Sequence, residues 1–239
     1  MARIRLTDQT PADAPSPHSM RIELLVVELL NDLLGATGRD VDCVIDATLS
    51  RLRKIGRFDR IFLYRRRTDD SFFSAGEWVA AGVPASRPEM QRVTQADLPM
   101  WFDDLLAGHP VLVPDAARLP PGSREQALLA HQGVKSSLIV PLRHGDRTIG
   151  LLGHDSLRRR RKLNRDEQFL FQSVARAVAT LLTRAEAEAD LAASQLRLSA
   201  TLRAIPDLVL EVDGDGRLLA QHSSAARAIL PLAEQAVGH

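Results

Sequence analysis

Cysteine is nearly absent from this sequence of 239 residues, which contains one, Cys43. A single thiol cannot form an intramolecular disulfide, and this excludes a disulfide-stabilised scaffold. The N-terminal segment lacks the apolar core of a signal peptide. Charged residues also interrupt the most apolar run, residues 20–34, before it reaches the ~18–20 residues that span a bilayer. We therefore expect a cytoplasmic protein without a membrane segment.

Net charge is equally small, because 31 basic residues face 30 acidic ones and leave +1. This balance gives no indication of nucleic-acid or membrane binding. Common catalytic motifs are missing as well. The seven histidines never occur at metal-ligand spacing, and no G-x-S-x-G elbow is present. The segment Gly133-Val-Lys135-Ser136 lacks the earlier glycine of a Walker loop. We expect no catalytic residue, no metal site and no nucleic-acid partner.

What remains is the composition of an ordinary folded protein, with 45% hydrophobic and 26% charged residues. A proline-containing stretch, residues 1–18, is expected to be a flexible leader. Apolar residues then recur at three- and four-residue steps, which predicts helices over 20–34, ended by Gly35, and over 41–55. Cys43 is expected on the apolar face of the second helix, as a small buried residue.

Beyond residue 58 the apolar period shortens toward two, the spacing of a half-buried strand. Turn residues separate several of these segments and predict hairpins, most clearly around residues 144–146. Pro141 lies inside one strand and predicts a bulge or an edge-facing position, because proline cannot donate to a strand ladder. The expected strands are 60–66, 71–79, 90–94, 110–114, 137–143 and 147–154.

Two short helices are expected between these strands. One covers residues 97–107, with Asp97 as its N-cap and Gly108 as its stop. The other covers residues 123–132 and is capped by Ser123.

A long helix is expected to start at Asn164 as N-cap and to run to Ala204 without proline or glycine, about 60 Å at 1.5 Å per residue. Residues 169–182 are strongly apolar, as expected of a helix packed on a sheet, whereas residues 184–203 are charged and alanine-rich. Two stripes at alternating three- and four-residue steps are typical of coiled-coil faces and require a partner helix. The stripes are Leu182, Ala185, Ala189, Ala192 and Leu196, and Leu191, Gln195, Leu198, Leu202 and Ile205.

Residues 20–184 resemble a GAF domain in the order of their predicted elements and in several local motifs. The motifs are similar to those of the GAF subgroup found in bacterial sensor kinases and cyclic-dinucleotide enzymes. The resemblance implies an α+β fold, an α/β sandwich with a central antiparallel sheet of about five to six strands, helices on one face and a long C-terminal signalling helix. The matching motifs are Phe58-Asp59-Arg60 with Ile61 to Tyr64, Glu77-Trp78-x-x-x-Gly82, Pro99-Met-Trp101, Leu105 to Gly108, Gly133 to Pro141, Gly150 to Ser156 and Asn164 to Glu167.

Residues 185–204 are then expected to be a coiled-coil linker helix, and residues 205–239 resemble the first strands and helix of an incomplete PAS domain. This order is similar to the sensory front of a longer signalling protein whose output is a histidine kinase or a diguanylate cyclase. We find no GGDEF motif, ATP-binding glycine box or phosphoacceptor helix. The resemblance implies a sensory module that is itself catalytically silent and forms a homodimer through helices 20–34 and 164–204.

In GAF domains a ligand pocket lies between the sheet and the loops and helix that cover its distal face. The resemblance therefore implies a small-molecule site in which the two tryptophans stack on a planar ligand and Glu77 accepts hydrogen bonds. The alternative is that the tryptophans fill the core and that the domain is a dimerisation and interaction module without a ligand. The candidate pocket residues are Glu77, Trp78, Trp101, Phe102, Val113, Ser136, Ser137 and His154.

Some GAF relatives hold a bilin through a thiol or a characteristic histidine, and others reduce free methionine sulfoxide with several cysteines. One cysteine on a helix disfavours both chemistries. We expect no covalent bilin and also no haem, and the identity of the ligand stays open. Five consecutive cations, Arg158 to Lys162, lie where the family has a solvent loop before its last helix. We expect a solvated loop there, or one that pairs with acids of a neighbouring domain.

Overall fold

The computed structural model describes residues 24, 27–29, 31–32, 35, 41–55, 58–161, 165–204 and 209–222. These residues divide after Arg184 into two compact units. Four expectations fall wholly or mostly outside the described residues: the leader, the helix over 20–34, the cap at Asn164 and the PAS-like segment over 205–239.

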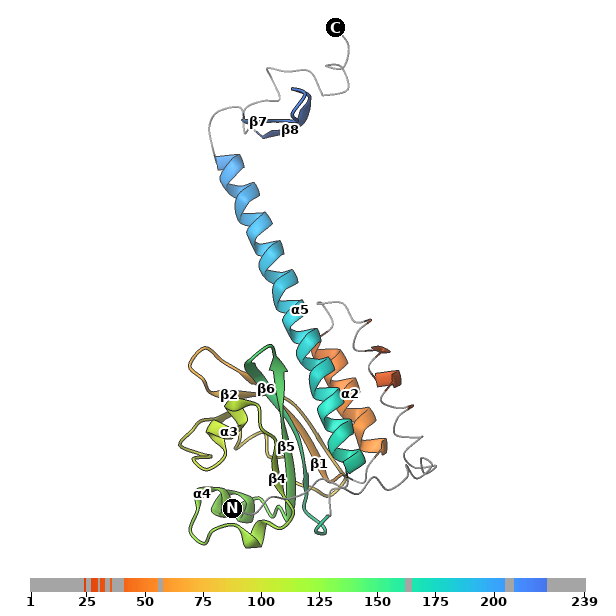
Figure 1. Cartoon of the computed structure of the whole chain (residues 1–239), viewed down its shortest axis with the longest axis vertical. Coiled ribbons are helices and arrows are strands. Elements are labelled where there is room, and N and C mark those ends of the chain that lie inside the picture. Colours follow the sequence, from red (N-terminus) through yellow and green to blue (C-terminus); the bar gives the residue numbers. More distant parts are fainter. Residues whose placement is uncertain are drawn as a thin grey trace, which may run out of the picture. The chain divides into compact units, whose positions relative to one another are not determined.

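A six-stranded antiparallel sheet forms the centre of the first unit (Figure 1). Its strand order is β3-β2-β1-β6-β5-β4, so β1 and β6, which are far apart in the sequence, lie side by side in the middle. This sheet confirms the expected α+β class. The strands are β1 (Arg60–Arg66), β2 (Phe72–Val79), β3 (Arg92–Val93), β4 (Val111–Val113), β5 (Ser136–His144) and β6 (Arg147–Ser156).

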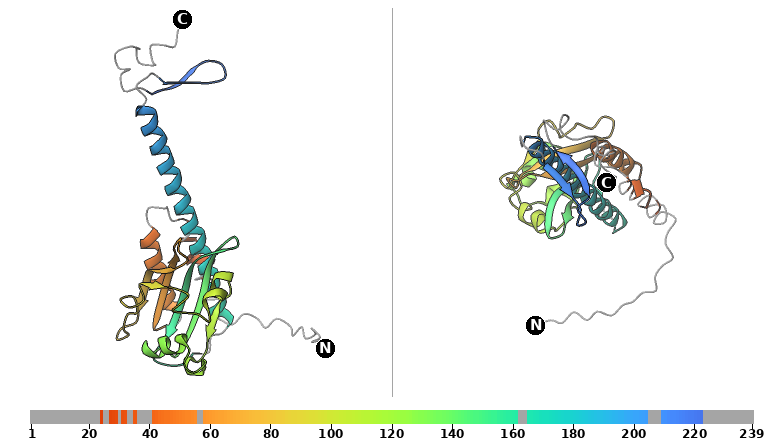
Figure 2. Two further views of the ribbon diagram at one scale, coloured as in Figure 1. Left: turned by 90° about the vertical axis from the view of Figure 1, so that its left-hand side faces the viewer. Right: turned by 90° about the horizontal axis from the view of Figure 1, so that it is seen from above.

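Helices cover both faces of the sheet (Figures 1 and 2). The helices α2 (Val41–Ile55) and α5 (Arg165–Ala204) lie on one face. The short helices α3 (Phe102–Ala107) and α4 (Arg124–His131) lie on the other, with a 3-10 turn at Ala116–Arg118. Since successive side chains of a strand point to opposite faces, each central strand contributes to two apolar cores. We call the face of the sheet that α2 and α5 cover the α5 face, and the face that α3 and α4 cover the cavity face.

Close packing of α2 on β2 requires a glycine. A Cβ added to Gly76 would lie 3.1 Å from Leu49 and 3.2 Å from Ile45, and both of these α2 side chains are buried. Cys43 lies outside this buried stripe and is exposed. The expectation of a buried Cys43 is therefore wrong, because the apolar stripe of α2 passes through Val41, Ile45, Thr48, Leu49 and Leu52 and leaves position 43 in solvent.

The ends of the short helices follow the predicted caps with one exception. Ser123 Oγ accepts a hydrogen bond from the backbone N–H of Gln126 at 3.2 Å, and Gly108 ends α3 with a φ of 91°. The carboxylate of Asp97, however, accepts hydrogen bonds from the N–H and Oγ1 of Thr94. Asp97 therefore closes a turn before α3, and the helix starts at Phe102. Beside Pro141, the register of β5 shifts between Leu142 and Arg143, as a bulge predicts.

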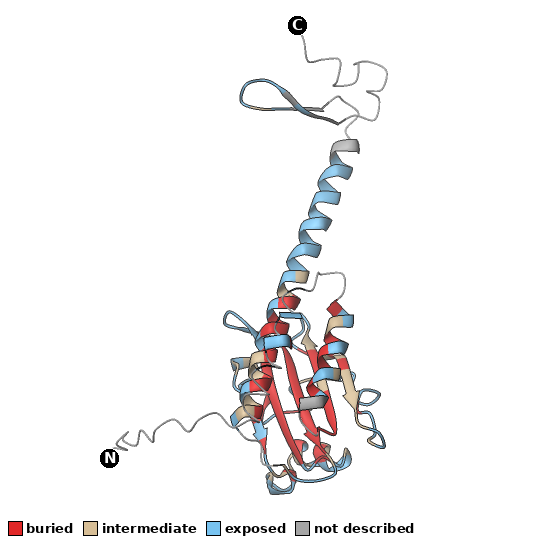
Figure 3. Cartoon of the chain, turned by 90° about the vertical axis from the view of Figure 1, so that its right-hand side faces the viewer, coloured by how far each residue is buried: buried red, intermediate tan, exposed pale blue. Residues whose placement is uncertain are grey.

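The long helix is present as expected, 40 residues from Arg165 to Ala204. Buried residues run along it as far as Leu182, and residues 186–201 are exposed throughout (Figure 3). The second unit also contains a two-stranded antiparallel hairpin, β7 (Val209–Val212) and β8 (Leu218–His222). Within the described residues, every helix is too short or too polar to cross a bilayer.

Candidate functional site

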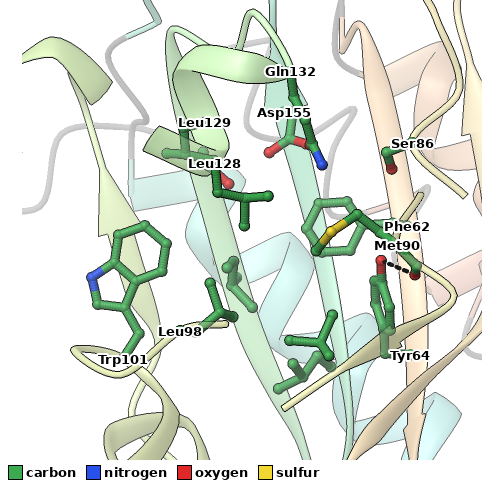
Figure 4. Close-up of a pocket in the computed structure, with 14 residues that line it drawn as sticks. Phe62, Tyr64, Ser86, Met90, Leu98, Trp101, Leu128, Leu129, Gln132 and Asp155 are labelled. Carbon is green, nitrogen blue, oxygen red and sulfur yellow. Dashed lines mark hydrogen bonds between the residues drawn. The ribbon is translucent and has the colours of Figure 1, made fainter. Parts of the chain in front are cut away.

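A cavity of about 60 Å³ lies on the cavity face, between the sheet and the elements around α3 and α4 (Figure 4). Most of its wall is apolar, and four polar side chains gather on the wall formed by β5, β6, α4 and the loop after β2. The apolar lining comprises Phe62, Tyr64, Met90, Val93, Leu98, Trp101, Leu128, Leu129, Ile139 and Leu151. The polar lining comprises Ser86, Gln132, Ser137 and Asp155.

Strand alternation places this lining. Tyr64 pairs with Leu151 across β1 and β6, and Ser137 pairs with Asp155 across β5 and β6. The hydroxyl of Tyr64 donates to the carbonyl of Met90 at 3.0 Å, which ties the loop after β2 to the sheet. Burial raises the pKa of this phenol, and the carboxylates of Glu77 and Asp155 raise it further, in excess of the lowering by Arg60.

We call the part of the wall formed by the four polar lining residues the polar end of the cavity. A buried ion pair between Arg60 and Asp155 lies there. Arg60 is 1% exposed, and its Nε and Nη2 donate to Asp155 Oδ2 at 2.9 and 2.6 Å. Its Nη2 also donates to Gln132 Oε1 at 2.6 Å, which connects β1 to the end of α4. Such charge-assisted pairs are strong and directional, so Arg60 holds Asp155 and Gln132 in place.

Glu77 is the second carboxylate beside Arg60, with Oε1 4.0 Å from Arg60 Nε. Its Oε1 accepts hydrogen bonds from the N–H and Oγ of Ser86 at 2.8 and 2.6 Å, and its Oε2 accepts one from the N–H of Arg87 at 3.1 Å. Glu77 thus fixes the loop after β2 over the polar end, and Ser86 stands between it and the cavity.

The residues predicted for the pocket are divided by the sheet. Trp101 and Ser137 line the cavity. Phe102 and Val113 are buried in the same hydrophobic core as the apolar lining residues but do not line the cavity themselves. Glu77 lies behind Ser86. Binding of a ligand by any of these side chains stays a prediction.

Three other predicted pocket residues lie on the α5 face. The ring of Trp78 packs under Arg53 of α2, 5.5 Å from its guanidinium carbon. Ser136 Oγ accepts a hydrogen bond from the N–H of Arg161. His154 stacks against Phe171 of α5.

His154 is fully buried between two phenyl rings. Its ring centroid lies 4.4 Å from that of Phe58 and 4.8 Å from that of Phe171, and among the described residues neither ring nitrogen has a hydrogen-bond partner. Burial, and then the nearby charge of Arg161, lower the pKa of His154 to about 3. The imidazole is therefore neutral at physiological pH and packs as an apolar ring.

The basic run before α5 is exposed at Arg158, Arg159 and Arg160, as expected of a solvated loop, and three of its arginines pair with acids of their own domain. Arg158 Nη1 lies 3.7 Å from Asp59 Oδ1, and Arg160 Nε lies 3.1 Å from Asp115 Oδ1. Arg161 pairs with Glu167 in the first turn of α5. The backbone N–H groups of Leu157 and Arg158 also donate to Asp59. These bonds fasten the connection between β6 and α5, and Lys162 lies outside the described residues.

Comparison with known proteins places the chain in a family. The family model for the GAF domain matches residues 40–182, more than half of the 239 residues, so the chain belongs to the GAF family. GAF domains are sensory modules that bind ligands and typically have no catalytic activity of their own.

A curated relative, the methanogenesis regulatory histidine kinase FilI of Methanothrix harundinacea (strain 6Ac), is 29% identical over 160 residues. The match covers 64% of this chain and 18% of the kinase. The chain thus spans less than a fifth of the length of this relative.

Solved GAF structures share the fold. The phycocyanobilin-bound GAF domain of a cyanobacterial phytochrome has a TM-score of 0.59 at 20% identity, covering 70% of this chain and 96% of that one. The PixJ GAF domain of Thermosynechococcus elongatus has a TM-score of 0.57 at 21% identity, covering 65% and 92%. A bacteriophytochrome chromophore-binding domain from R. palustris has a TM-score of 0.61 at 18% identity, covering 74% and 65%.

One of these structures is described as bound to phycocyanobilin, a bilin. The residues of the present chain do not fit a covalently attached bilin. The one cysteine, Cys43, is on α2, which packs on the α5 face, and His154 is on that face as well. A cavity of about 60 Å³ is also smaller than the roughly 150 Å³ that holds benzene, and a linear tetrapyrrole is several times larger than benzene. No step of the function is therefore assigned to a bilin.

Proposed function

We propose that the chain is the sensory input part of a longer signalling protein and that it binds a small molecule in the cavity beside Asp155. The proposal is supported chiefly by the polar end of the cavity. There, hydrogen bonds from Arg60 hold Asp155 and Gln132 in fixed positions beside otherwise apolar walls. Sites for small molecules commonly combine apolar walls with a few fixed polar groups. Trp101 and Ser137 are the predicted residues that would contact the ligand, with Glu77 holding Ser86.

The end of β6 connects this cavity to α5. Asp155 faces the cavity, and the preceding residue, His154, packs on Phe171 of α5. A ligand that displaces Asp155 would move the strand that carries His154, and one packing of α5 would then be favoured over another. In this way differential ligand affinity for two packings biases the helix.

The signal would leave through a dimer of α5. Leu191, Leu196 and Leu198 are 60%, 73% and 61% exposed in a helix with coiled-coil spacing. We propose a cytoplasmic homodimer through helices 20–34 and 164–204, with residues 20–184 as the GAF domain and residues 185–204 as the linker. Residues 205–239 would begin a PAS domain, supported by the hairpin β7–β8. The output would be a histidine kinase, as in the relative, or a diguanylate cyclase.

A second candidate function is favoured by the small volume of the cavity. At about 60 Å³ the space suits a few water molecules as well as a ligand, and the exposed leucines of α5 do not depend on it. The domain would then be a dimerisation and interaction module without a small-molecule ligand.

Native mass spectrometry of the chain purified from its own host distinguishes the two functions, because it reports bound mass and stoichiometry together. We expect a dimer at about 100 μM that carries a small molecule. Leu128→Trp places an indole in the cavity from α4 and should abolish the added mass, whereas Ala130→Trp places the same ring at an exposed position of that helix. A dimer without added mass in all three proteins would support the interaction module, and a monomer would contradict the dimer.

A further inference from the structure

The charges around the cavity do not balance. Among the residues that line it none is Lys, Arg or His, and Asp155 is the acidic one. Behind the wall lie Arg60, which is paired with Asp155, and Glu77, which is 4.0 Å from Arg60. One guanidinium therefore faces two carboxylates, and both acids are buried, with side chains 6% and 5% exposed. The polar end thus has an excess of one negative charge.

The same three charges act on the phenol of Tyr64, which also lines the cavity and whose pKa is raised first of all by burial. Glu77 and Asp155 each raise its pKa by more than Arg60 lowers it. At the Tyr64 hydroxyl the two carboxylates thus outweigh the guanidinium, in agreement with the charges found at the polar end. Charges act strongly at such a site because little water is present to screen them.

From these contacts we infer that the cavity selects a compact, uncharged or cationic molecule that donates an N–H to Asp155 and rejects an anion of the same shape. This inference rests on the proposed function and specifies the ligand class of the same cavity. Both hydrogen bonds from Arg60 to Asp155 end on Oδ2. The ligand would therefore donate to the other carboxylate oxygen, Oδ1. The apolar body of the ligand would lie against Phe62 and Trp101, whose ring faces also favour a cation. An anion would meet two carboxylates and no uncompensated cation.

Three molecules of one shape and different charge test the inference: acetamidinium, acetamide and acetate. Their few atoms limit affinity to the range of about 0.1 to 100 mM, which NMR titration of the full chain can measure. The chain has two tryptophans, so two indole N–H signals are expected and Trp78→Phe assigns them. Trp101 lines the cavity, and Trp78 on the α5 face is an internal control.

We expect acetamidinium and acetamide to shift the Trp101 signal at concentrations at least about tenfold lower than acetate, with the Trp78 signal unmoved. Acetate that binds as well as the other two would overturn the inference and leave the proposed function standing. Failure of all three to shift Trp101 would count against the ligand site itself and so against the proposed function.

A charge variant locates the origin of the preference. Glu77→Gln removes one carboxylate and keeps an oxygen that can accept from Ser86, so the preference for acetamidinium over acetate should fall about tenfold or more. Glu89→Gln removes an exposed carboxylate in the neighbouring loop and should leave the preference unchanged. Equal preferences in Glu77→Gln and the unmodified chain would contradict the inference.

Discussion

Replacing Arg60 with methionine is expected to lower the free energy of unfolding by about 3 to 5 kcal/mol, the usual cost of leaving one partner of a buried ion pair. The substitution removes the arginine that pairs with Asp155 and the hydrogen bond to Gln132. Methionine can replace part of the stem's packing, so the loss arises from the stranded carboxylate. Two carboxylates, Asp155 and Glu77, then lie buried near each other without a counter-charge.

Urea denaturation of the full chain, followed by tryptophan fluorescence, measures this loss. The double variant Arg60→Met with Asp155→Leu removes both charges and should recover a large part of the stability, because no charge is left unpaired. Arg92→Met breaks the exposed pair with Asp69 and should leave the unfolding midpoint nearly unchanged. A single Arg60→Met variant as stable as Arg92→Met would show that the buried pair does not hold the polar end together.

Replacing His154 with leucine is expected to make the protein more stable in acid than the unmodified chain. The pKa of His154 is lowered from 6.5 to about 3 in the folded protein. Below pH 6.5 the unfolded chain therefore takes up a proton that the folded protein does not. Stability from the neutral imidazole is fully present above pH 6.5 and is lost at about 1.4 kcal/mol per pH unit as pH falls toward 3.

The difference between the two proteins isolates this group from the carboxylates that also titrate in acid. Between pH 7 and pH 5 the stability of His154→Leu relative to the unmodified chain should rise by about 2 kcal/mol. At pH 7 the variant should be as stable or slightly more stable, since neither ring nitrogen has a hydrogen bond to lose within the part of the chain that the structure describes. Denaturation curves that keep a constant difference at both pH values would contradict the buried neutral state of His154.

The sheet could be predicted from local signals because its hairpins are marked in the sequence. The segment Arg60–Arg66 is a strand with the predicted bounds, and β5 and β6 flank the predicted turn at residues 144–146. The start of helix α3 was predicted wrongly, because that prediction relied on Asp97 as the N-cap. An aspartate that can cap a helix also closes a turn, and here it bonds to Thr94.

The sequence does not show which face of the sheet each strand residue points to. For this reason the predicted site residues lie on two different faces. Both faces of the central strands are buried, so alternation in polarity is lost and the parity of a residue is not visible in the sequence. His154 and Asp155 are neighbours, yet one packs on α5 and the other lines the cavity. In the same way Trp78, beside Glu77, lies under α2.

Arg60 was missed for a different reason. A charged residue at the start of a strand usually lies in solvent, and its partner Asp155 is 95 residues away. Local patterns carry no information about such a pair. A signal was nevertheless present, since Arg60 and Asp155 both lie within the segments that resemble the GAF family.

We propose that occupation of the cavity changes the packing of α5, and hydrogen exchange in this helix measures such a change. Peptide exchange is compared between the chain as purified from its host and the same chain after denaturation, dialysis and refolding. We expect residues 165–182, among which Phe171 packs against Phe58 and His154, to exchange at rates that differ several-fold between the two samples. Differences confined to the cavity loops and α4, with identical exchange in residues 165–182, would contradict the claim.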